Sequence, residues 1–172
     1  MSTRSMPNFK PIFTGIIACL FSALALGQEK LPQVLHLKVT SDIDPRSNRY
    51  VTLGLERAIE MNVDFVILEL DTYGGALTDA DEIRTKILNY ERPIYAFINK
   101  DAASAGALIS IACDSIYMTT GSSIGAATVV TGEGKAAPDK YQSYMRSIMR
   151  STAESNGRNP EIAEAMVDEK FF

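Results

Sequence analysis

Two short segments of the chain contain the residue types that acyl-transfer chemistry needs. The first is residues 101–106 (DAASAG), where the Ser104 hydroxyl lies between residues too small to cover it, at the start of an apolar stretch. We expect a buried helix to begin there, and helix N-termini stabilise negative charge such as an alkoxide or the oxyanion of a tetrahedral intermediate. Serine is also an ordinary helix N-cap residue, and for an isolated serine that is the commoner role.

The second segment is the pair Gly74 and Gly75, which directly follows a nearly continuous apolar run at residues 64–70. Ligand sites in open α/β sheets lie at the ends of such strands. Paired glycines allow a substrate to approach backbone N–H groups closely, although the same dipeptide also makes simple strand-to-helix turns. The pair is therefore a candidate donor of hydrogen bonds to a reacting carbonyl.

A serine nucleophile needs a neighbouring base, and the sequence offers two kinds. His36 is the single histidine, but it lies in the first predicted strand and no Ser-His-Asp order is evident, so we expect a structural or surface residue. Lys140 follows Pro138 in the first turn of a predicted helix, where the helix dipole disfavours a cation and so favours the neutral amine. Lys135, in a glycine-rich loop, is a poorer candidate, and a solvated surface lysine is the alternative for Lys140.

Other classes of site find little support in the sequence. The chain has one histidine and two cysteines, and we see no spacing typical of metal ligands and no glycine-rich phosphate loop, so no metal or cofactor is expected. The net charge is −4 and no region is strongly basic, which argues against nucleic acid as a partner. Cys113 lies in an apolar stretch and is expected to be a small buried hydrophobic residue.

An alternation of strands and helices should position these groups. We expect strands at 34–40, 64–70, 93–98 and 115–118 and helices at 50–61, 77–89, 103–112, from 138 onward and at 160–167. We predict that the 64–70 strand is buried on both faces. The 44–45 pair is expected to break the chain, Thr78 to cap a helix, and 121–127 to form a loop. The apolar stripe of the 138 helix is expected to consist of Tyr141, Tyr144, Met145, Ile148 and Met149.

The N-terminal 27 residues have the order of a secretory signal. Arg4 and Lys10 precede an apolar run at 12–26, which ends in small residues and a polar turn. We expect cleavage near residue 27, a mature domain at 28–172, and a location outside the cytoplasm. There are two alternatives. One is an uncleaved membrane anchor, which requires about 20 apolar residues, and the other is a lipoprotein site at Cys19.

Four blocks of the sequence, in this order, resemble the NfeD-type membrane-bound Clp-class serine proteases. They are VDFVILELDTYGGALTDADEIRTKI, PIYAFINKDAASAGALISIACDSIYM, GSSIGAA and APDKYQSYMRSIMRSTAESNGRN, and together they cover most of the chain after the signal. The resemblance implies an α/β fold of the Clp protease/crotonase type, with a mostly parallel sheet and repeated β-β-α-type units.

The resemblance also implies roles for individual residues. Ser104 would be the nucleophile and Lys140 its general base, so that the two form a Ser-Lys dyad. The oxyanion hole would consist of backbone N–H groups of Gly74 or Gly75 and of Ala105. The GSSIGAA block would line the site, through Ser123, Ile124 and Gly125.

Substrate and assembly also follow from the resemblance. It implies a serine endopeptidase that cleaves an apolar peptide, in the family the C-terminal region of a stomatin-like membrane protein. It further implies membrane association, a periplasmic or other extracytoplasmic location, and a homodimer or larger homo-oligomer. Two departures stand out: Tyr73 occupies a position that is usually proline, and the membrane helices and C-terminal barrel of long family members are expected to be missing.

Two other functions fit parts of the same pattern. A crotonase-type acyl-CoA enzyme would share the fold and the backbone oxyanion hole, but export argues against it because coenzyme A is cytoplasmic. A non-catalytic partner of a stomatin-like scaffold would keep Ser104 and Lys140 without using them. A fluorophosphonate probe separates these readings, since it labels Ser104 only if the pair is competent.

Overall fold

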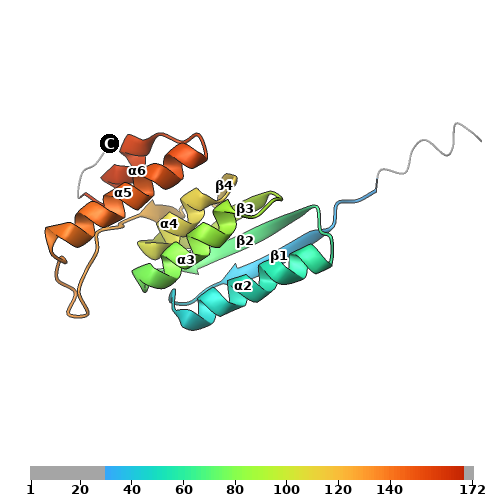
Figure 1. The fold of residues 1–172 in the computed structure, drawn as a ribbon, viewed down its shortest axis with the longest axis horizontal. Helices are drawn as coiled ribbons and strands as arrows, with labels where there is room; N and C mark the ends of the chain where they lie inside the picture. Colours follow the sequence, from blue (N-terminus) through green and yellow to red (C-terminus); the bar gives the residue numbers. More distant parts are fainter. Residues whose placement is uncertain (1–29, 169–172) are drawn as a thin grey trace, which may run out of the picture. The chain divides into compact units, whose positions relative to one another are not determined.

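The computed structural model describes residues 30–168, so the predicted signal segment and Cys19 lie outside the described residues. Four strands lie side by side in chain order and form the body of a sheet: β1 (Val34–Val39), β2 (Phe65–Thr72), β3 (Ile94–Ala103) and β4 (Ser115–Met118) (Figure 1). A fifth strand, β5 (Ser123–Gly125), pairs with the last residues of β3. All of these strand pairs are parallel.

Three helices form the crossovers between successive strands: α2 (Pro45–Glu60), α3 (Leu77–Leu88) and α4 (Ala105–Ala112). Parallel strands joined in sequential order by right-handed crossovers place their helices on one face of the sheet. Figure 1 shows these helices together in front of the strands, and α3 packs on α4. Two further helices, α5 (Asp139–Ser155) and α6 (Pro160–Ala165), follow β5. The predicted α/β fold with a parallel sheet is confirmed.

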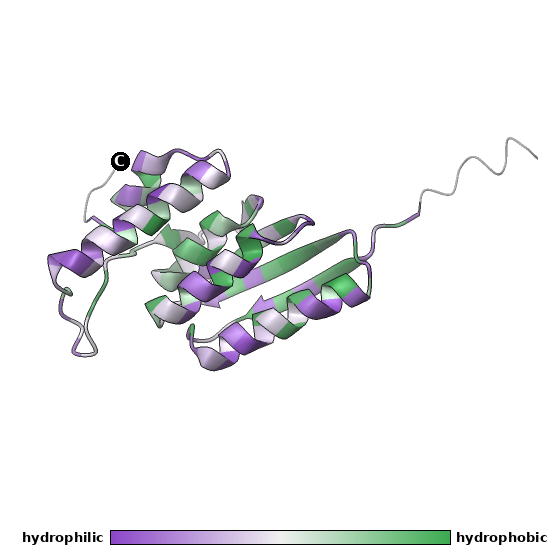
Figure 2. Ribbon diagram, viewed as in Figure 1, coloured by the Kyte–Doolittle hydropathy of each residue, from purple (hydrophilic) through white to green (hydrophobic). Residues whose placement is uncertain are grey.

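The core lies between the sheet and its helices. On β2 and β3, the buried side chains that face it include Leu68, Leu70 and Ile98, and both strands are largely hydrophobic (Figure 2). Of the alternate residues, Ile67 and Phe97 are only partly buried, whereas the charged Glu69 is buried. The prediction that the β2 segment is buried on both faces is therefore wrong for the described residues, because the three crossover helices cover a single face.

Several element boundaries differ from the predictions for local reasons. The 44–45 pair begins α2 instead of breaking the chain, because Asp44 accepts hydrogen bonds from the N–H groups of Arg46 and Ser47 and forms a capping box. Thr78 lies inside α3, since Ala76 takes the N-cap position without a side-chain hydrogen bond. Part of the predicted loop at 121–127 is strand β5.

Helix α5 differs from its predicted amphipathic pattern. Met145, Ile148 and Met149 are buried as expected, whereas Tyr141 and Tyr144 are exposed. The buried face of the helix instead includes the polar residues Gln142 and Thr152. These polar side chains are buried because each finds hydrogen-bond partners in neighbouring backbone or side chains.

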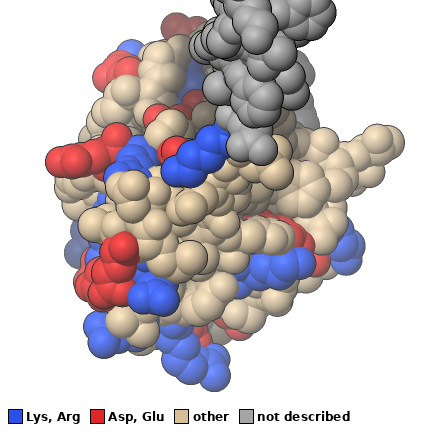
Figure 3. All heavy atoms as spheres, turned by 90° about the vertical axis from the view of Figure 1, so that its right-hand side faces the viewer, with Lys and Arg blue, Asp and Glu red and all other residues tan. Residues whose placement is uncertain are grey.

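The surface carries charges of both signs. On the side drawn in Figure 3, basic and acidic side chains lie in mixed groups separated by uncharged surface. Between residues 30 and 168, no helix is both long enough and apolar enough to span a bilayer.

Candidate active site

Ser104 occupies the junction between strand β3 and helix α4. Its backbone lies at φ 53° and ψ −115°, and it is one of three described residues other than glycine with a positive φ. The Ser104 N–H donates to the Gly125 carbonyl at 2.8 Å. The residue holds the N-cap position of α4, but its hydroxyl makes no capping hydrogen bond. A strained backbone that leaves a side chain free is a recurring property of functional sites.

The Gly74–Gly75 turn packs directly against this serine. A Cβ atom added to Gly74 would lie 2.7 Å from the Ser104 Cβ and 3.2 Å from its Oγ, and Gly74 has φ +114°, so only glycine fits. The Gly74 N–H donates to the Thr72 hydroxyl at 3.1 Å. Ile43 holds the turn from the other side, because its N–H donates to Gly74 O and its carbonyl accepts from the Ala76 N–H.

Two backbone N–H groups remain available beside Ser104. Gly75 is exposed, and its N–H takes part in none of the hydrogen bonds of the described turn. Ala105 is the first residue of α4, and the first N–H groups of a helix have no intrahelical acceptor. Gly106 allows α4 to approach the end of β2, since a Cβ there would lie 2.8 Å from the Thr72 methyl group. Ala105 directly follows Ser104 in the chain, and Gly75 directly follows Gly74, which packs against Ser104.

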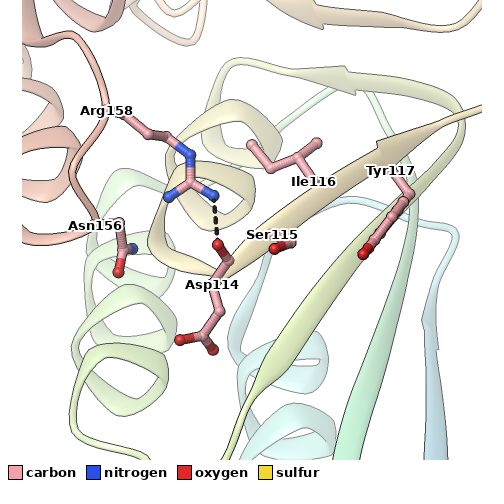
Figure 4. A pocket seen from close by; sticks show the side chains of 6 residues that line it. All are labelled: Asp114, Ser115, Ile116, Tyr117, Asn156 and Arg158. Atoms are coloured by element: carbon pink, nitrogen blue, oxygen red, sulfur yellow. Dashed lines mark hydrogen bonds between the residues drawn. The ribbon is translucent and has the colours of Figure 1, made fainter.

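The far end of α4 is held by residues that follow α5. The Asn156 amide donates to the carbonyls of Ile111 and Ala112 at 2.9 and 2.8 Å. The Arg158 guanidinium donates to Ile111 O, Cys113 O and Asp114 O, and Figure 4 shows it reaching the last of these. These contacts satisfy carbonyls that the C-terminus of a helix otherwise leaves unpaired. They fix the helix that carries Ser104 at its other end.

Lys140 lies in the first turn of α5 and is exposed. Its ammonium rests 4.8 Å from the centroid of the Tyr141 ring, and no hydrogen bond joins it to Ser104 in the described residues. The lysine borders a groove with a volume of about 550 Å³ between the first turns of α3 and α5. The groove is lined by Leu77, Thr78, Asp81, Val129, Lys140, Tyr141 and Tyr144. Catalytic hydrogen bonds are often long or poorly aligned in unliganded sites and tighten when substrate binds.

The three residues predicted to line the site lie on strand β5. Gly125 pairs with Ala103 and accepts the Ser104 N–H, so it touches the nucleophile position directly. Ile124 pairs with Ala102 one residue earlier in the strand. Ser123 is further out, and its hydroxyl donates to the Asp101 carboxylate at 2.7 Å.

Two other reactive residue types are placed away from the site. The His36 Nε2 lies 2.8 Å from a Glu69 carboxylate oxygen on strand β2. Burial raises the pKa of the Cys113 thiol to about 12, which keeps the thiol protonated and unreactive. Both residues have the structural roles predicted from the sequence.

Sequence reasoning missed two residues that shape the site. The Thr72 hydroxyl accepts from the Gly74 N–H, and its methyl group packs against Gly106. The Ile43 backbone forms hydrogen bonds with Gly74 and Ala76 on either side of the turn. Thr72 could have been noticed, because a hydroxyl residue between a buried strand and a glycine pair is well placed to bond the turn. Ile43 gives no such signal, since its contacts are made by main-chain atoms about 30 positions away from the turn.

Comparison with known proteins places the chain among membrane-bound relatives. Residues 33–171 match the family model "NfeD1b, N-terminal domain". The chain is 32% identical over 162 residues to membrane protein NfeD1b of Bacillus subtilis, and 30% identical over 166 residues to membrane-bound protease PH1510 of Pyrococcus horikoshii. These alignments cover 94% and 91% of the chain but only 37% of each relative.

Solved structures agree with this placement. Two structures of the 1510-N membrane-bound stomatin-specific protease are 26% identical to the chain. In one, alanine replaces a serine; in the other, alanine replaces a lysine and a substrate peptide is bound. They cover 81% of this chain and 72% or 68% of their own, with TM-scores of 0.75 and 0.76. ClpP1 from Listeria monocytogenes, 17% identical, covers 79% of this chain and 80% of its own with a TM-score of 0.64, which shows the Clp protease-like fold.

Proposed function

The chain belongs to the NfeD1b N-terminal domain family, and we propose that it is a serine endopeptidase with Ser104 as nucleophile and Lys140 as general base. One observation carries this proposal: the free Ser104 hydroxyl lies at a strained strand-to-helix turn, packed against the Gly74–Gly75 backbone. Serine nucleophiles of other folds are presented in the same way, on a sharp turn between a strand and a helix. The protease relatives support the same reaction class.

In the proposed reaction each of these groups has one role. The neutral Lys140 amine takes the proton from the Ser104 hydroxyl as the oxygen attacks the scissile carbonyl. The N–H groups of Gly75 and Ala105 stabilise the negative charge that develops on the carbonyl oxygen. The Lys140 ammonium then protonates the leaving amine, and an acyl-enzyme remains on Ser104. Water, deprotonated by the same amine, hydrolyses this ester and restores the serine.

Substrate binding must bring Lys140 to Ser104 for this to work. In the structure the Lys140 ammonium is exposed and lies over the Tyr141 ring. A lysine side chain is long and flexible, so a change of rotamer can supply part of this approach. A peptide that covers the groove would also remove water from the amine, and desolvation favours its neutral form.

The substrate and location belong to the same proposal. We infer an apolar peptide from a stomatin-like membrane protein, because a structural relative is described as a stomatin-specific protease and binds a substrate peptide. The order of residues 1–27 supports export and a mature domain from residue 28, with the site on the extracytoplasmic side of a membrane. A homodimer or larger assembly is proposed on the family resemblance alone.

A non-catalytic partner of a membrane scaffold is the second candidate, and the lack of a hydrogen bond between Lys140 and Ser104 among the described residues favours it. Cleavage of apolar peptides by purified protein and by its Ser104→Ala variant distinguishes the two. The peptidase proposal expects cleavage that is lost in the variant. Cleavage by neither protein, with the peptides bound equally, would support the scaffold role instead.

A further inference from the structure

We infer that Tyr144 determines the size of the apolar side chain that the enzyme accepts beside the scissile bond. This inference rests on the peptidase function proposed above and assigns one of its specificity residues. Tyr144 lies on α5, one helical turn beyond Lys140, and its hydroxyl donates to the Asp81 carboxylate on α3 at 3.0 Å. Both residues line the groove between the two helices.

The hydrogen bond between Tyr144 and Asp81 bridges the groove at a defined distance from the site. Leu77 and Asp81 are four residues apart on α3, and Lys140 and Tyr144 are four apart on α5, so each pair lies on one helix face. Four residues of helix span about 6 Å. The groove is therefore lined by Leu77 and Lys140 near its start and is crossed by the Tyr144 ring one turn further along.

The partners of Tyr144 hold its ring in place. The second oxygen of the Asp81 carboxylate accepts from the Arg84 Nε at 2.7 Å, and the Arg84 side chain is mostly buried. Arg84 in turn donates to the Thr152 hydroxyl on α5 at 3.3 Å. The hydrogen bond to Asp81 also raises the pKa of Tyr144, so the phenol keeps its proton throughout the neutral range. The half-exposed ring is thus anchored across the groove at its hydroxyl end.

The groove begins close in the chain to the predicted oxyanion site, because its lining residue Leu77 opens the helix that follows the glycine turn. Leu77 follows Gly75 by two residues, and Gly74 touches Ser104, so the three-residue step from Gly74 to Leu77 spans at most about 11 Å. A peptide whose carbonyl is held by the Gly75 N–H thus places a neighbouring side chain in the groove. Leu77, Val129 and the tyrosine rings make this lining mainly apolar, and its volume of about 550 Å³ is typical of ligand sites.

The groove accordingly accepts the side chain of one apolar substrate residue next to the scissile bond. The Tyr144 ring limits the length of that side chain. Leu77 and the Tyr144–Asp81 hydrogen bond are one helical turn apart, about 6 Å, so we expect leucine-sized side chains to be accepted between them and an indole to meet the ring. A change in pocket size by a methylene or more alters selectivity by about 10- to 200-fold. Removing the ring should therefore move selectivity toward larger side chains by a factor in this range.

The test measures kcat/KM for peptides that differ at one position at a time on either side of the scissile bond, with alanine, leucine, phenylalanine or tryptophan there. We expect Tyr144→Ala to raise the tryptophan-to-leucine ratio at least tenfold at one position, and Tyr144→Trp to lower it. Tyr144→Phe, which keeps the ring and loses the hydrogen bond to Asp81, should give a smaller rise. Tyr117→Ala removes an exposed ring from a strand outside the groove and should leave every ratio unchanged.

The outcomes separate the inference from the function beneath it. Retained cleavage with unchanged ratios in both Tyr144→Ala and Tyr144→Trp overturns the specificity role alone, as does an equal shift in Tyr117→Ala. Absence of Ser104-dependent cleavage in the wild-type protein overturns the peptidase proposal and the specificity role with it. Circular dichroism confirms the fold of each variant, and Tyr144→Trp decides the question if Tyr144→Ala does not fold.

Discussion

Ser104 combines a disfavoured backbone conformation with a side chain that contributes no capping hydrogen bond. A non-glycine residue in such a conformation costs about 1–3 kcal/mol, and such strain persists where the surrounding structure imposes it. Here the Gly125 carbonyl and the Gly74 backbone impose it from two sides. The residue thus has properties that suit a nucleophile and do not serve stability.

Substitution of Ser104 should therefore separate activity from stability. We expect Ser104→Ala to abolish cleavage and to change the free energy of unfolding by less than about 0.5 kcal/mol, as for substitutions that break no structural contact. Ser104→Gly should be equally inactive but more stable by about 1 kcal/mol, because glycine relieves the strain at some cost in unfolded-state entropy. Urea unfolding and peptide cleavage measure the two effects.

A true N-cap provides the matched control for this prediction. The Asp44 side chain accepts two backbone N–H groups at the start of α2, so Asp44→Ala should cost about 1 kcal/mol. If Ser104→Ala destabilised the protein as much as Asp44→Ala, the hydroxyl would have a structural role that the geometry does not show.

The sequence predicted the chemical types at the site better than their geometry. Ser104, the glycine pair and Lys140 could be selected from small neighbours, a preceding strand and a helix start. The positive φ of Ser104 could not be selected, because it depends on a hydrogen bond to β5, and the sequence predicts a loop at that strand. The present position of the Lys140 ammonium over Tyr141 depends on a surface rotamer, which sequence does not encode.

At the scale of elements, one buried amide ties helix α5 to the segment before it. The Gln142 Oε1 accepts from the Val129 N–H at 2.9 Å, and its Nε2 donates to Val129 O at 2.7 Å and Ala137 O at 3.1 Å. The side chain is 8% exposed, so these bonds form in a largely dry environment. Gln142 thereby closes the base of the 129–137 loop, whose first residue lines the groove.

Gln142→Ala should open this loop. It leaves the Val129 and Ala137 groups without these partners, and a buried unpaired polar group costs about 1–3 kcal/mol. We expect faster tryptic cleavage after the exposed Lys135, measured by mass spectrometry under native conditions. Gln33→Ala, a change at an exposed position, should leave the rate of tryptic cleavage unchanged. Equal cleavage rates in the wild-type protein and both variants would show that Gln142 does not hold the loop closed.

A cluster of charged and polar side chains around Glu69, on the face of the sheet opposite α3, should make the free energy of unfolding depend on pH. Glu69 is buried and binds Lys38 Nζ at 3.0 Å, His36 Nε2 at 2.8 Å and the Asn99 amide at 3.0 Å. The hydrogen bond from Lys38, with those from Asn99 and His36, holds the pKa of Glu69 below its ordinary value of 4.5, although burial opposes this.

The sign of the effect follows from proton binding. Because the folded state binds this proton less readily, Glu69 adds stability above about pH 4.5, and that stability is lost as the pH falls through the lowered pKa. Urea unfolding between pH 6 and pH 3 should show a smaller loss of stability for Glu69→Gln than for the wild-type protein. The exposed Glu56→Gln should follow the wild-type curve, and identical slopes in all three would refute the assignment.

The sequence predicts several elements close to their observed bounds. Strand β4 was predicted to the residue, and β1, β2, α3 and α6 to within two residues at either end. Strand β5 has only three residues, too few to show an alternating pattern, and its sequence SIG suggests a turn. The burial of β2 on a single face could not be predicted either, because it depends on where the crossovers place their helices.

At the scale of the whole molecule, residues 32–168 belong to one compact unit with Ser104, the glycine turn and the groove at the strand ends that lead into α3 and α4. This is the edge where parallel sheets bind their ligands. The chain spans 37% of the length of its two curated relatives, so their full activities concern a larger protein.

Export of the chain can be tested independently of catalysis. The basic, apolar and small residues of 1–27 predict removal of this segment, which would leave a mature N-terminus near Gln28 outside the cytoplasm. Intact-mass measurement on protein from fractionated cells should show this shortened chain in the extracytoplasmic fraction. A full-length chain in the cytoplasmic fraction would contradict the prediction, and a full-length chain in the membrane would support an anchor instead.

Covalent labelling of Ser104 tests the central claim most directly. A fluorophosphonate reacts with a serine only when a base activates it, and a guanidinium cannot act as that base because it does not lose its proton. Peptide mapping by mass spectrometry should find the label on Ser104 in the wild-type protein and in a Lys135→Arg control, with a rate that rises with pH. Lys140→Arg should reduce labelling at least 100-fold, because general-base catalysis contributes about that much or more. Labelling of Ser104 in Lys140→Arg at the wild-type rate, or no labelling of Ser104 in the wild-type protein, would contradict the Ser-Lys mechanism.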